Sequence, residues 1–157
     1  SHHVTSLEDI RVRDLMVKDF PTVPEAATLT DIVRIAAEHP HVENLPIMSG
    51  SGHLQGLIRT EDLKRLVDSD MQPSLFRALD IAQQSPIAIP PDANLLDALR
   101  DFGHRDDVES LPVVVTTPSG PRLIGLLPRT SVMQRYRQEL LLHYPDAKAA
   151  VFTPPAA

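Results

Sequence analysis

The side chains that could perform chemistry in this chain are carboxylates, arginines and histidines, because the 157 residues include no cysteine. The lack of cysteine excludes a thiolate metal site, a disulfide framework and a cysteine nucleophile. His39 and His41 form the tightest histidine cluster away from the N-terminus, but a zinc site needs about four converging ligands. The acidic segment 106–109 lacks the ligand spacing of a calcium loop. We therefore predict no metal site.

A predicted turn from a strand into a helix brings together a further group of reactive side chains, Arg59, Thr60 and Asp62. A carboxylate in the first turn of a helix stabilises the helix dipole by about 0.3–1 kcal/mol, which is one interpretation of Asp62. Arg59 could bind a phosphate group, or it could pair with Glu61 or Asp62 on the surface. The chain has no nucleophile elbow and no phosphate-binding loop, so we predict that it is not an enzyme.

These groups belong to an internal repeat, in which residues 13–48 align without a gap with residues 79–114. Identical residues in the two halves include Pro24 and Pro90, Asp31 and Asp97, Arg34 and Arg100, and Leu45-Pro46 and Leu111-Pro112. Beyond residue 48, small insertions are needed to align Gly56 with Gly125. Self-similarity at a fixed spacing indicates a duplicated supersecondary unit.

The first unit predicts the order strand, helix, strand, strand, helix. An extended run at 20–23 is followed by Thr28, a good N-cap residue, and then by apolar residues at helical spacing. Two short apolar runs, at 45–48 and 53–58, flank a glycine-rich hairpin turn. A second helix then begins near Thr60.

The second unit repeats this order. Its extended run lies at 86–89, and its first helix follows Asn94, which is again a good N-cap residue. Its hairpin strands lie at 111–115 and 122–127, and its last helix begins near Thr130.

One unit of about 60 residues would bury too little of its surface to be stable alone. We therefore predict an α/β (α+β) fold, in which two βαββα units pack sheet against sheet about a pseudo-two-fold axis and share a common core. Between the units, Pro73 suits the first turn of a short helix that runs through Leu79. The predicted boundaries are motif 1 at 10–68, a linker at 69–78, motif 2 at 79–142, and flexible ends at 1–9 and 143–157.

The formal net charge of −6 argues against nucleic acid as a partner, because binding a phosphate backbone requires a basic surface. No apolar stretch approaches the roughly 20 residues that cross a membrane, so we predict no direct membrane insertion of this segment. The absence of cysteine fits a reducing compartment. We expect a cytoplasmic location, either alone or as the cytosolic domain of an inner-membrane protein.

The repeated units resemble the CBS (cystathionine-β-synthase) domain family in their leading segment, central strand and closing strand-to-helix turn. The matching segments are 12–16, 22–31, Leu45-Pro46-Ile47, Leu111-Pro112-Val113 and 56–63. The resemblance covers nearly all of residues 10–137. It implies a tandem CBS pair, or Bateman-type module, that forms a homodimer and senses a small ligand such as AMP, ADP or ATP. No cofactor is required.

The resemblance also assigns roles to the closing turn of each repeat. In the family this turn carries a glycine, two apolar residues, a serine or threonine, and an aspartate three residues later. The hydroxyl and the helix N-terminal N–H groups receive phosphate, and the aspartate accepts from the ribose hydroxyls. This chain keeps Gly56 and Asp62 but has Arg59 at the hydroxyl position. The second repeat has Pro128 and Ser131 at the hydroxyl and aspartate positions.

By resemblance, each ligand site takes its aspartate from one repeat and its base-binding wall from the other. The cleft of Asp62 would then be walled by 87–88 and 108–110, whereas the opposite cleft would use Thr22 and 42–44. Ser131 would be a poor ribose acceptor there, so we favour the Asp62 cleft. The implied nucleotide-binding residues are Asp62, Arg59, Thr60, Gly56, Ala88, Ile87, Glu109 and Thr22.

The segments 7–14 and 136–140 resemble the cytoplasmic end of a bacterial chloride channel or transporter of the CLC family. This likeness implies an attached or partner membrane transport domain that the module controls. Magnesium/cobalt efflux proteins and stand-alone CBS proteins are alternatives. A hypothesis of a different class is a structural dimerisation module that binds no ligand, which the altered turn of the second repeat favours.

Overall fold

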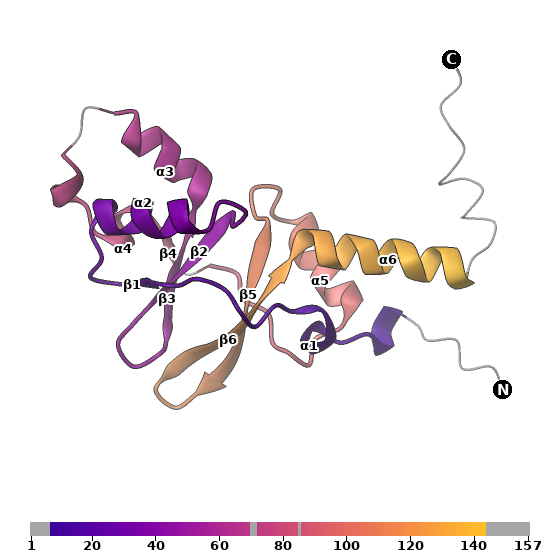
Figure 1. Cartoon of the computed structure of the whole chain (residues 1–157). Helices are drawn as coiled ribbons and strands as arrows, with labels where there is room; N and C mark the ends of the chain where they lie inside the picture. Colours follow the sequence, from indigo (N-terminus) through magenta and orange to yellow (C-terminus); the bar gives the residue numbers. More distant parts are fainter. Residues whose placement is uncertain (1–6, 70–71, 85, 144–157) are drawn as a thin grey trace, which may run out of the picture.

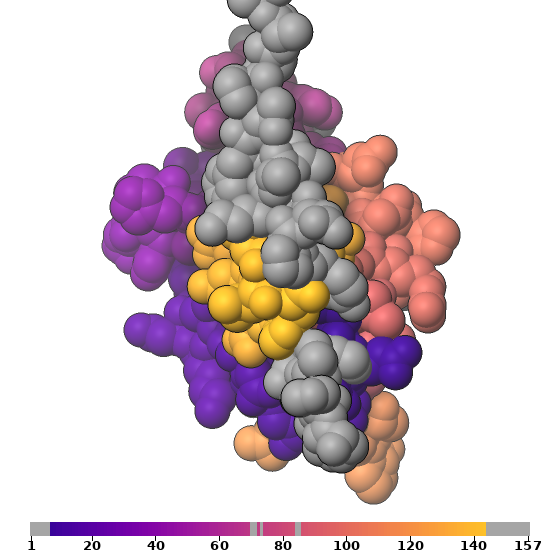
Figure 2. All heavy atoms as spheres, turned by 90° about the vertical axis from the view of Figure 1, so that its right-hand side faces the viewer, coloured from indigo at the N-terminus to yellow at the C-terminus, as the bar shows by residue number. Residues whose placement is uncertain are grey.

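Two units of strands and helices, one from each repeat, lie side by side in the computed structural model (Figure 1). The structure describes residues 7–69, 72–84 and 86–143. Both units have mixed α and β structure, as predicted. Figure 2 shows the last helix facing the viewer between N-terminal residues, in indigo, and the segment around residue 100, in salmon.

Repeat 1 provides a short parallel strand and an antiparallel hairpin, covered by two helices. Its elements are β1 (Val23–Pro24), α2 (Leu29–Glu38), β2 (Asn44–Met48), β3 (Leu54–Arg59) and α3 (Thr60–Val67). Strand β1 pairs in parallel with β2, and β2 pairs antiparallel with β3. The predicted order of elements in this repeat is therefore confirmed.

Repeat 2 provides a longer hairpin and a longer final helix. Its elements are α5 (Leu95–Gly103), β5 (Ser110–Thr117), β6 (Gly120–Pro128) and α6 (Arg129–His143). The extended run predicted at 86–89 is reduced to one parallel bridge, in which Ile89 pairs with Val113. This bridge occupies the same place in repeat 2 that β1 occupies in repeat 1.

The first helix of each repeat begins with the predicted N-cap residue. The Asp31 backbone N–H donates to Thr28 Oγ1 over 3.3 Å, and the Thr28 N–H donates back to the Asp31 carboxylate over 3.1 Å. Asn94 and Asp97 make the same reciprocal pair, at 2.9 and 3.0 Å. Each cap satisfies backbone donors that the first turn of a helix leaves without an intrahelical partner.

The repeats exchange their leading segments, which the sequence did not predict. Helices α1 (Val12–Leu15) and α4 (Ala78–Ile81) each dock onto the opposite repeat. The Val12 N–H donates to the Ala93 carbonyl over 2.8 Å, and the Ala78 N–H donates to the Ala27 carbonyl over 3.1 Å. Because these bonds are equivalent under the repeat spacing, the exchange follows the pseudo-two-fold symmetry.

Strand pairing continues the same exchange. Val17 pairs with Leu126 of β6, and the short strand β4 (Gln83–Gln84) pairs antiparallel with β3. The sheet of repeat 1 therefore has the order β1-β2-β3-β4, and its last strand comes from the second half of the chain. Each sheet is completed by residues that the alignment assigns to the other repeat.

The single common core predicted from the sequence is replaced by two clusters. The cluster of repeat 1 includes Ile32 and Leu45 and takes Ala78 from the exchanged helix α4. The cluster of repeat 2 includes Phe102 and takes Val12 from the exchanged helix α1. Each repeat thus supplies a fully buried residue to the core of the other, which explains why neither half is a complete folding unit.

One prediction about the linker needs correction. The helix predicted from Pro73 through Leu79 is instead a 3-10 turn, Pro73–Leu75, separated from α4 by the extended residue Arg77. Leu7–Asp9, within the end segment 1–9, also form a 3-10 turn, and Leu7 packs against the core of repeat 2. Residues 1–6 and 144–157 lie outside the described residues.

Candidate functional site

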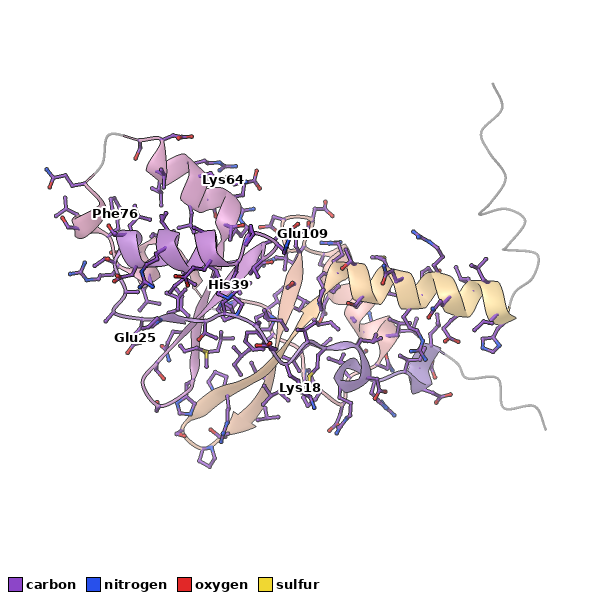
Figure 3. All side chains as sticks on the ribbon, viewed as in Figure 1. Lys18, Glu25, His39, Lys64, Phe76 and Glu109 are labelled. Atoms are coloured by element: carbon purple, nitrogen blue, oxygen red, sulfur yellow. The ribbon has the colours of Figure 1, made fainter. Side chains whose placement is uncertain are left out.

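Two clefts lie between the repeats, and each is lined by residues of both. The Phe20 cleft has a volume of about 340 Å³ and is lined by Val17, Asp19, Phe20, Pro21, His41, Val42, Glu43, Asn44, Glu109, Ser110, Leu126, Pro128 and Thr130. The Arg59 cleft has a volume of about 510 Å³ and is lined by Glu43, Asn44, Arg59, Thr60, Glu61, Lys64, Asp106, Asp107 and Glu109. The two clefts meet at three shared residues, Glu43, Asn44 and Glu109, and Figure 3 shows Glu109 at the junction of the repeats.

Backbone hydrogen bonds fix the closing turn of each repeat beside its central strand. The Thr60 N–H donates to the Glu43 carbonyl over 3.0 Å, and the Arg129 N–H donates to the Glu109 carbonyl over 2.8 Å. The Thr60 hydroxyl also donates to the Glu43 carbonyl, over 3.3 Å. Thr60, one of the implied nucleotide-binding residues, therefore has both its N–H and its hydroxyl bonded within the protein.

Arg59 and Asp62 form a bidentate pair within the closing turn of repeat 1. Arg59 Nε donates to Asp62 Oδ2 over 3.0 Å, and Nη2 donates to Oδ1 over 2.9 Å. Arg59 Nη1 also lies 3.7 Å from Asp107 of repeat 2. The hydrogen bond with Asp62 raises the pKa of Arg59. Surface pairing, one of the two alternatives for Arg59, is confirmed, and the Asp62 carboxylate faces its own arginine.

The closing turn of repeat 2 has a different arrangement. Arg129, at the position of Thr60, donates to the carbonyls of Arg105 and Val108 over 2.5 and 2.8 Å, and its Nε lies 3.9 Å from Glu109 Oε2 at the junction of the clefts. The same guanidinium lies 4.8 Å from the ring centroid of Phe102. These contacts close the end of α5 against α6, so Arg129 has a structural role.

The remaining predicted residues do not gather at one cleft. Gly56 lies in β3, where an added Cβ would be 3.2 Å from Ala82 Cβ, so the glycine allows β4 to approach. Ile87 is half-buried and packs against the core of repeat 2. Ala88 is also half-buried, and Thr22 is exposed next to the Phe20 cleft. Their roles in ligand binding stay predictions.

Asn44 is a site residue for which sequence analysis found no role beyond a place in one wall. It is 2% exposed, and neither its amide oxygen nor its amide nitrogen has a hydrogen-bond partner among the described residues. Buried polar groups are almost always bonded, so this amide is exceptional. The sequence signal that could have indicated a special role for Asn44 is its position as the one polar residue at the start of the otherwise apolar run 44–48.

Both clefts are acidic. The described lining of the Arg59 cleft holds five carboxylates but two cations, Arg59 and Lys64. The described lining of the Phe20 cleft holds the carboxylates of Asp19, Glu43 and Glu109, with no lysine or arginine. A bound anion would meet repulsion in either cleft, although in the Phe20 cleft Arg129 Nε, 3.9 Å from Glu109 Oε2, partly offsets one of the three carboxylates.

No described group of three or more histidines and carboxylates is arranged to hold a metal ion. His39, one of the two clustered histidines, directs Nδ1 to the Ile35 carbonyl at 3.0 Å. Within the described ranges, no helix is both long and apolar enough to cross a membrane.

Duplicated units that exchange their leading segments around two inter-repeat clefts define a paired-domain architecture. The CBS domain family model matches residues 12–69 and 78–137, and the chain belongs to this family as a tandem CBS pair. CBS pairs are generally regulatory and typically dimerise.

Individual CBS proteins are also similar to this chain in sequence or in structure. A CBS domain-containing protein of Dictyostelium discoideum is 25% identical over 134 residues, which cover 79% of this chain and 89% of the relative. The structure of CBSX2 in complex with AMP has a TM-score of 0.65 at 25% identity, covering 82% of this chain and 97% of that one. The CBS domain of a bacterial CNNM/CorC family Mg²⁺ transporter in complex with ATP has a TM-score of 0.68 at 22% identity, covering 86% and 89%.

Proposed function

We propose that this CBS pair is a regulatory module that binds an adenosine-containing ligand between its repeats and thereby controls an attached or partner protein. The observation that carries the proposal is the make-up of the clefts, in which both repeats contribute side chains that meet at Glu43, Asn44 and Glu109. A ligand at this junction would contact both halves of the molecule. The AMP complex of CBSX2 supports an adenosine-containing ligand.

The regulatory mechanism is a shift between relative packings of the repeats. A ligand can shift such an equilibrium only by its differential affinity for the two packings. Ile10 and Val12, near the first described residues, share the core cluster of repeat 2 with Val132 of α6, the last described helix, so a change at the junction would reach both segments. The signal would leave through the segments before Ile10 and after Leu142.

In the Arg59 cleft, a nucleotide would have to open the pair between Arg59 and Asp62. Its phosphate would take Arg59, and its ribose hydroxyls would then take the Asp62 carboxylate. Of the predicted wall, Glu109 lines this cleft and would face the base, whereas Ile87 and Ala88 are absent from its described lining. The acidic lining opposes this arrangement, so binding there would depend on Arg59.

The controlled partner is a membrane transport domain in this proposal. The likeness of 7–14 and 136–140 to the CLC family favours a chloride channel or transporter. The similarity to a transporter CBS domain of the CNNM/CorC family supports magnesium transport as the alternative. Cytoplasmic location follows from either partner, because the module would act on the cytosolic side.

Homodimerisation belongs to the same proposal. A groove of about 580 Å³ between α2 and α3 is lined largely by apolar residues, among them Val33, Leu63 and Val67. Val67 is 56% exposed. A second copy covering this groove would bury that surface, and Val67→Asp should then shift the protein to a monomer in sedimentation equilibrium.

The second candidate function is a dimerisation module without a ligand. The closed pair of Arg59 and Asp62, together with Ser131 at the corresponding position of repeat 2, favours it. In this case the groove between α2 and α3 would be the functional surface.

A thermal-shift series with AMP, ADP, ATP and S-adenosylmethionine separates the two functions. A ligand at a hundred times its Kd should add about 2.7 kcal/mol to the free energy of unfolding. Arg59→Ala should weaken any phosphate-dependent stabilisation. Arg100→Ala is the matched control, because Arg100 is exposed on α5 and pairs with Asp97 at 3.7 Å, away from the described cleft linings. No shift with millimolar ligand would favour the ligand-free function.

A further inference from the structure

The amide of Asn44 is buried at the junction of the two clefts without a partner for either of its polar atoms among the described residues. Such an amide lowers stability, because its water hydrogen bonds are lost and not replaced. We infer that the Phe20 cleft binds an uncharged purine nucleoside, that Asn44 reads the edge of its base, and that the cleft rejects the phosphorylated form. The inference rests on the proposed function and specifies its ligand.

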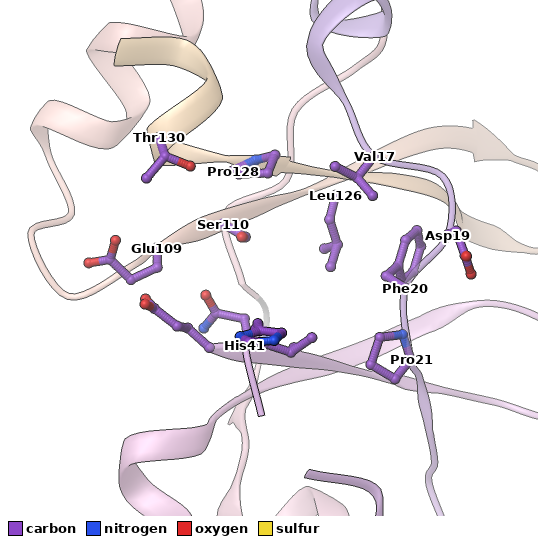
Figure 4. Close-up of a pocket in the computed structure, with 13 residues that line it drawn as sticks. Val17, Asp19, Phe20, Pro21, His41, Glu109, Ser110, Leu126, Pro128 and Thr130 are labelled. Atoms are coloured by element: carbon purple, nitrogen blue, oxygen red, sulfur yellow. The ribbon is translucent and has the colours of Figure 1, made fainter. Parts of the chain in front are cut away.

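The shape of the Phe20 cleft suits a flat ring. Its apolar side chains gather on one side, where Figure 4 shows Phe20 and Pro21 across from Val17 and Leu126. The volume of about 340 Å³ lies within the range of small-molecule sites. An aromatic base placed against Phe20 would bury apolar surface on both partners and gain a ring contact.

Asn44 supplies what a purine edge needs. Its amide offers one acceptor oxygen and a donor nitrogen side by side, and adenine presents the complementary donor and acceptor at N6 and N7. Recognition of this kind would satisfy both atoms that lack a described partner in the ligand-free protein. The stability lost at Asn44 is thereby recovered when the ligand binds.

The polar side of the cleft suits sugar hydroxyls and opposes phosphate. Figure 4 shows Glu109, Ser110 and Thr130 on this side. Carboxylates accept hydrogen bonds from hydroxyl groups, but they repel an anionic phosphate. The arginine of the closing turn, Arg129, is already engaged by the carbonyl groups of Arg105 and Val108, and its Nε lies 3.9 Å from Glu109 Oε2, so it partly offsets one of the three carboxylates. The described lining itself contains no lysine or arginine, so the repulsion of phosphate comes chiefly from Asp19 and Glu43.

Binding of adenosine and AMP to the whole chain, measured by calorimetry, tests the inference. Adenosine should bind at least tenfold more tightly than AMP at neutral pH. Phe20→Ala should weaken adenosine binding at least tenfold, whereas Arg100→Ala should not change it. A tighter affinity for AMP than for adenosine would overturn the inference while leaving the proposed function in place. No binding of adenosine, AMP or ATP would overturn both.

Asn44→Leu separates recognition from packing. The leucine removes two polar atoms that have no described partner, so the ligand-free variant should unfold at the same or a higher temperature. It should nevertheless lose at least tenfold in adenosine affinity. Retention of wild-type affinity would overturn the role of Asn44.

Glu109→Lys tests the charge argument independently, at an exposed residue whose carboxylate lies 3.9 Å from Arg129 Nε, and a thermal melt of the variant without ligand checks that the fold is intact. The new cation should raise the affinity for AMP at least tenfold relative to adenosine. An unchanged ratio of the two affinities would overturn the charge-based rejection of phosphate.

Discussion

The two repeats have the same helix caps and strand order, but they differ where their helices meet. In repeat 2, Phe102 is fully buried and the guanidinium of Arg129 lies 4.8 Å from its ring centroid. The equivalent positions in repeat 1 are Ala36 and Thr60, which line the groove of about 580 Å³ between α2 and α3. The two repeats therefore share the same order of strands and helices, but the space between their two helices is filled in repeat 2 and is an open apolar groove in repeat 1.

The closing turns differ in the same way. Repeat 1 has the charged pair of Arg59 and Asp62, which reaches toward Asp107 of repeat 2. Repeat 2 has Pro128 and Ser131 at the matching positions. The duplication therefore preserves the elements that hold the fold, whereas the groups facing the clefts and the groove have diverged. Each repeat keeps a buried core, and the open apolar groove belongs to repeat 1 alone among the described residues.

The largest effect should come from emptying the core of repeat 2. Phe102→Ala should lower the free energy of unfolding by about 3–5 kcal/mol, because it leaves a cavity and removes the surface on which Arg129 stacks. Leu99→Ala, in the same helix but only half-buried, should cost less. Urea denaturation measures both. A loss below about 1 kcal/mol for Phe102→Ala would contradict the contrast between a filled and an open repeat.

The exchange of leading segments can be tested at Gly56. A Cβ there would lie 3.2 Å from both Ala82 Cβ and the Gln83 carbonyl oxygen, so β4 would have to move away from β3. Gly56→Ala should cost about 1–3 kcal/mol of unfolding free energy. Gly50→Ala is the matched control, because no atom outside its chain neighbours lies within 4 Å and its stability should be unchanged or slightly higher.

These effects also mark what the sequence could predict. Local signals sufficed for the helix starts at Thr28 and Asn94, because capping depends on residues three positions apart. The exchange of α1 and α4 was missed, because alignment of the halves shows which residues are equivalent but not which repeat they contact. The unpartnered amide of Asn44 was also missed, since satisfaction of a polar group depends on every neighbour in space, here among the described residues.

The pair of Arg59 and Asp62 should contribute modestly to stability. Both side chains are partly exposed, at 27% and 28%, so solvent screens their attraction. A double-mutant cycle with Arg59→Ala and Asp62→Ala should give a coupling energy of about 0.2–1 kcal/mol, and it should weaken at high salt. A coupling energy near zero would mean that Arg59 is free to meet a ligand at no cost.

The smallest expected difference between the repeats is in how the stability contributed by a carboxylate on α2 and by one on α5 changes with pH. The hydrogen bonds from Thr28 lower the pKa of Asp31, whereas burial, followed by the nearby Asp97, raises the pKa of Asp101 on α5. Ionised Asp31 therefore stabilises the fold above the ordinary carboxyl pKa, and this stabilisation is lost as the pH falls through its lowered pKa. Ionised Asp101 opposes folding at neutral pH, and that cost disappears as the pH falls through its raised pKa.

Asp31→Asn should consequently be less stable than the wild type at pH 7, and Asp101→Asn should be more stable. Both differences should shrink in acid, first for Asp101 as the pH falls through its raised pKa and later for Asp31 as the pH falls through its lowered pKa, although the Asp31→Asn variant would also keep a weaker cap through its side-chain amide oxygen. Urea denaturation at pH 7, 5 and 3 measures the two curves. Parallel curves for both variants and the wild type would show that neither carboxylate changes its proton affinity on folding. Opposite signs would show that the capping carboxylate Asp31 and the partly buried Asp101, whose equivalent position in repeat 1 is Ile35, respond to acid in opposite directions.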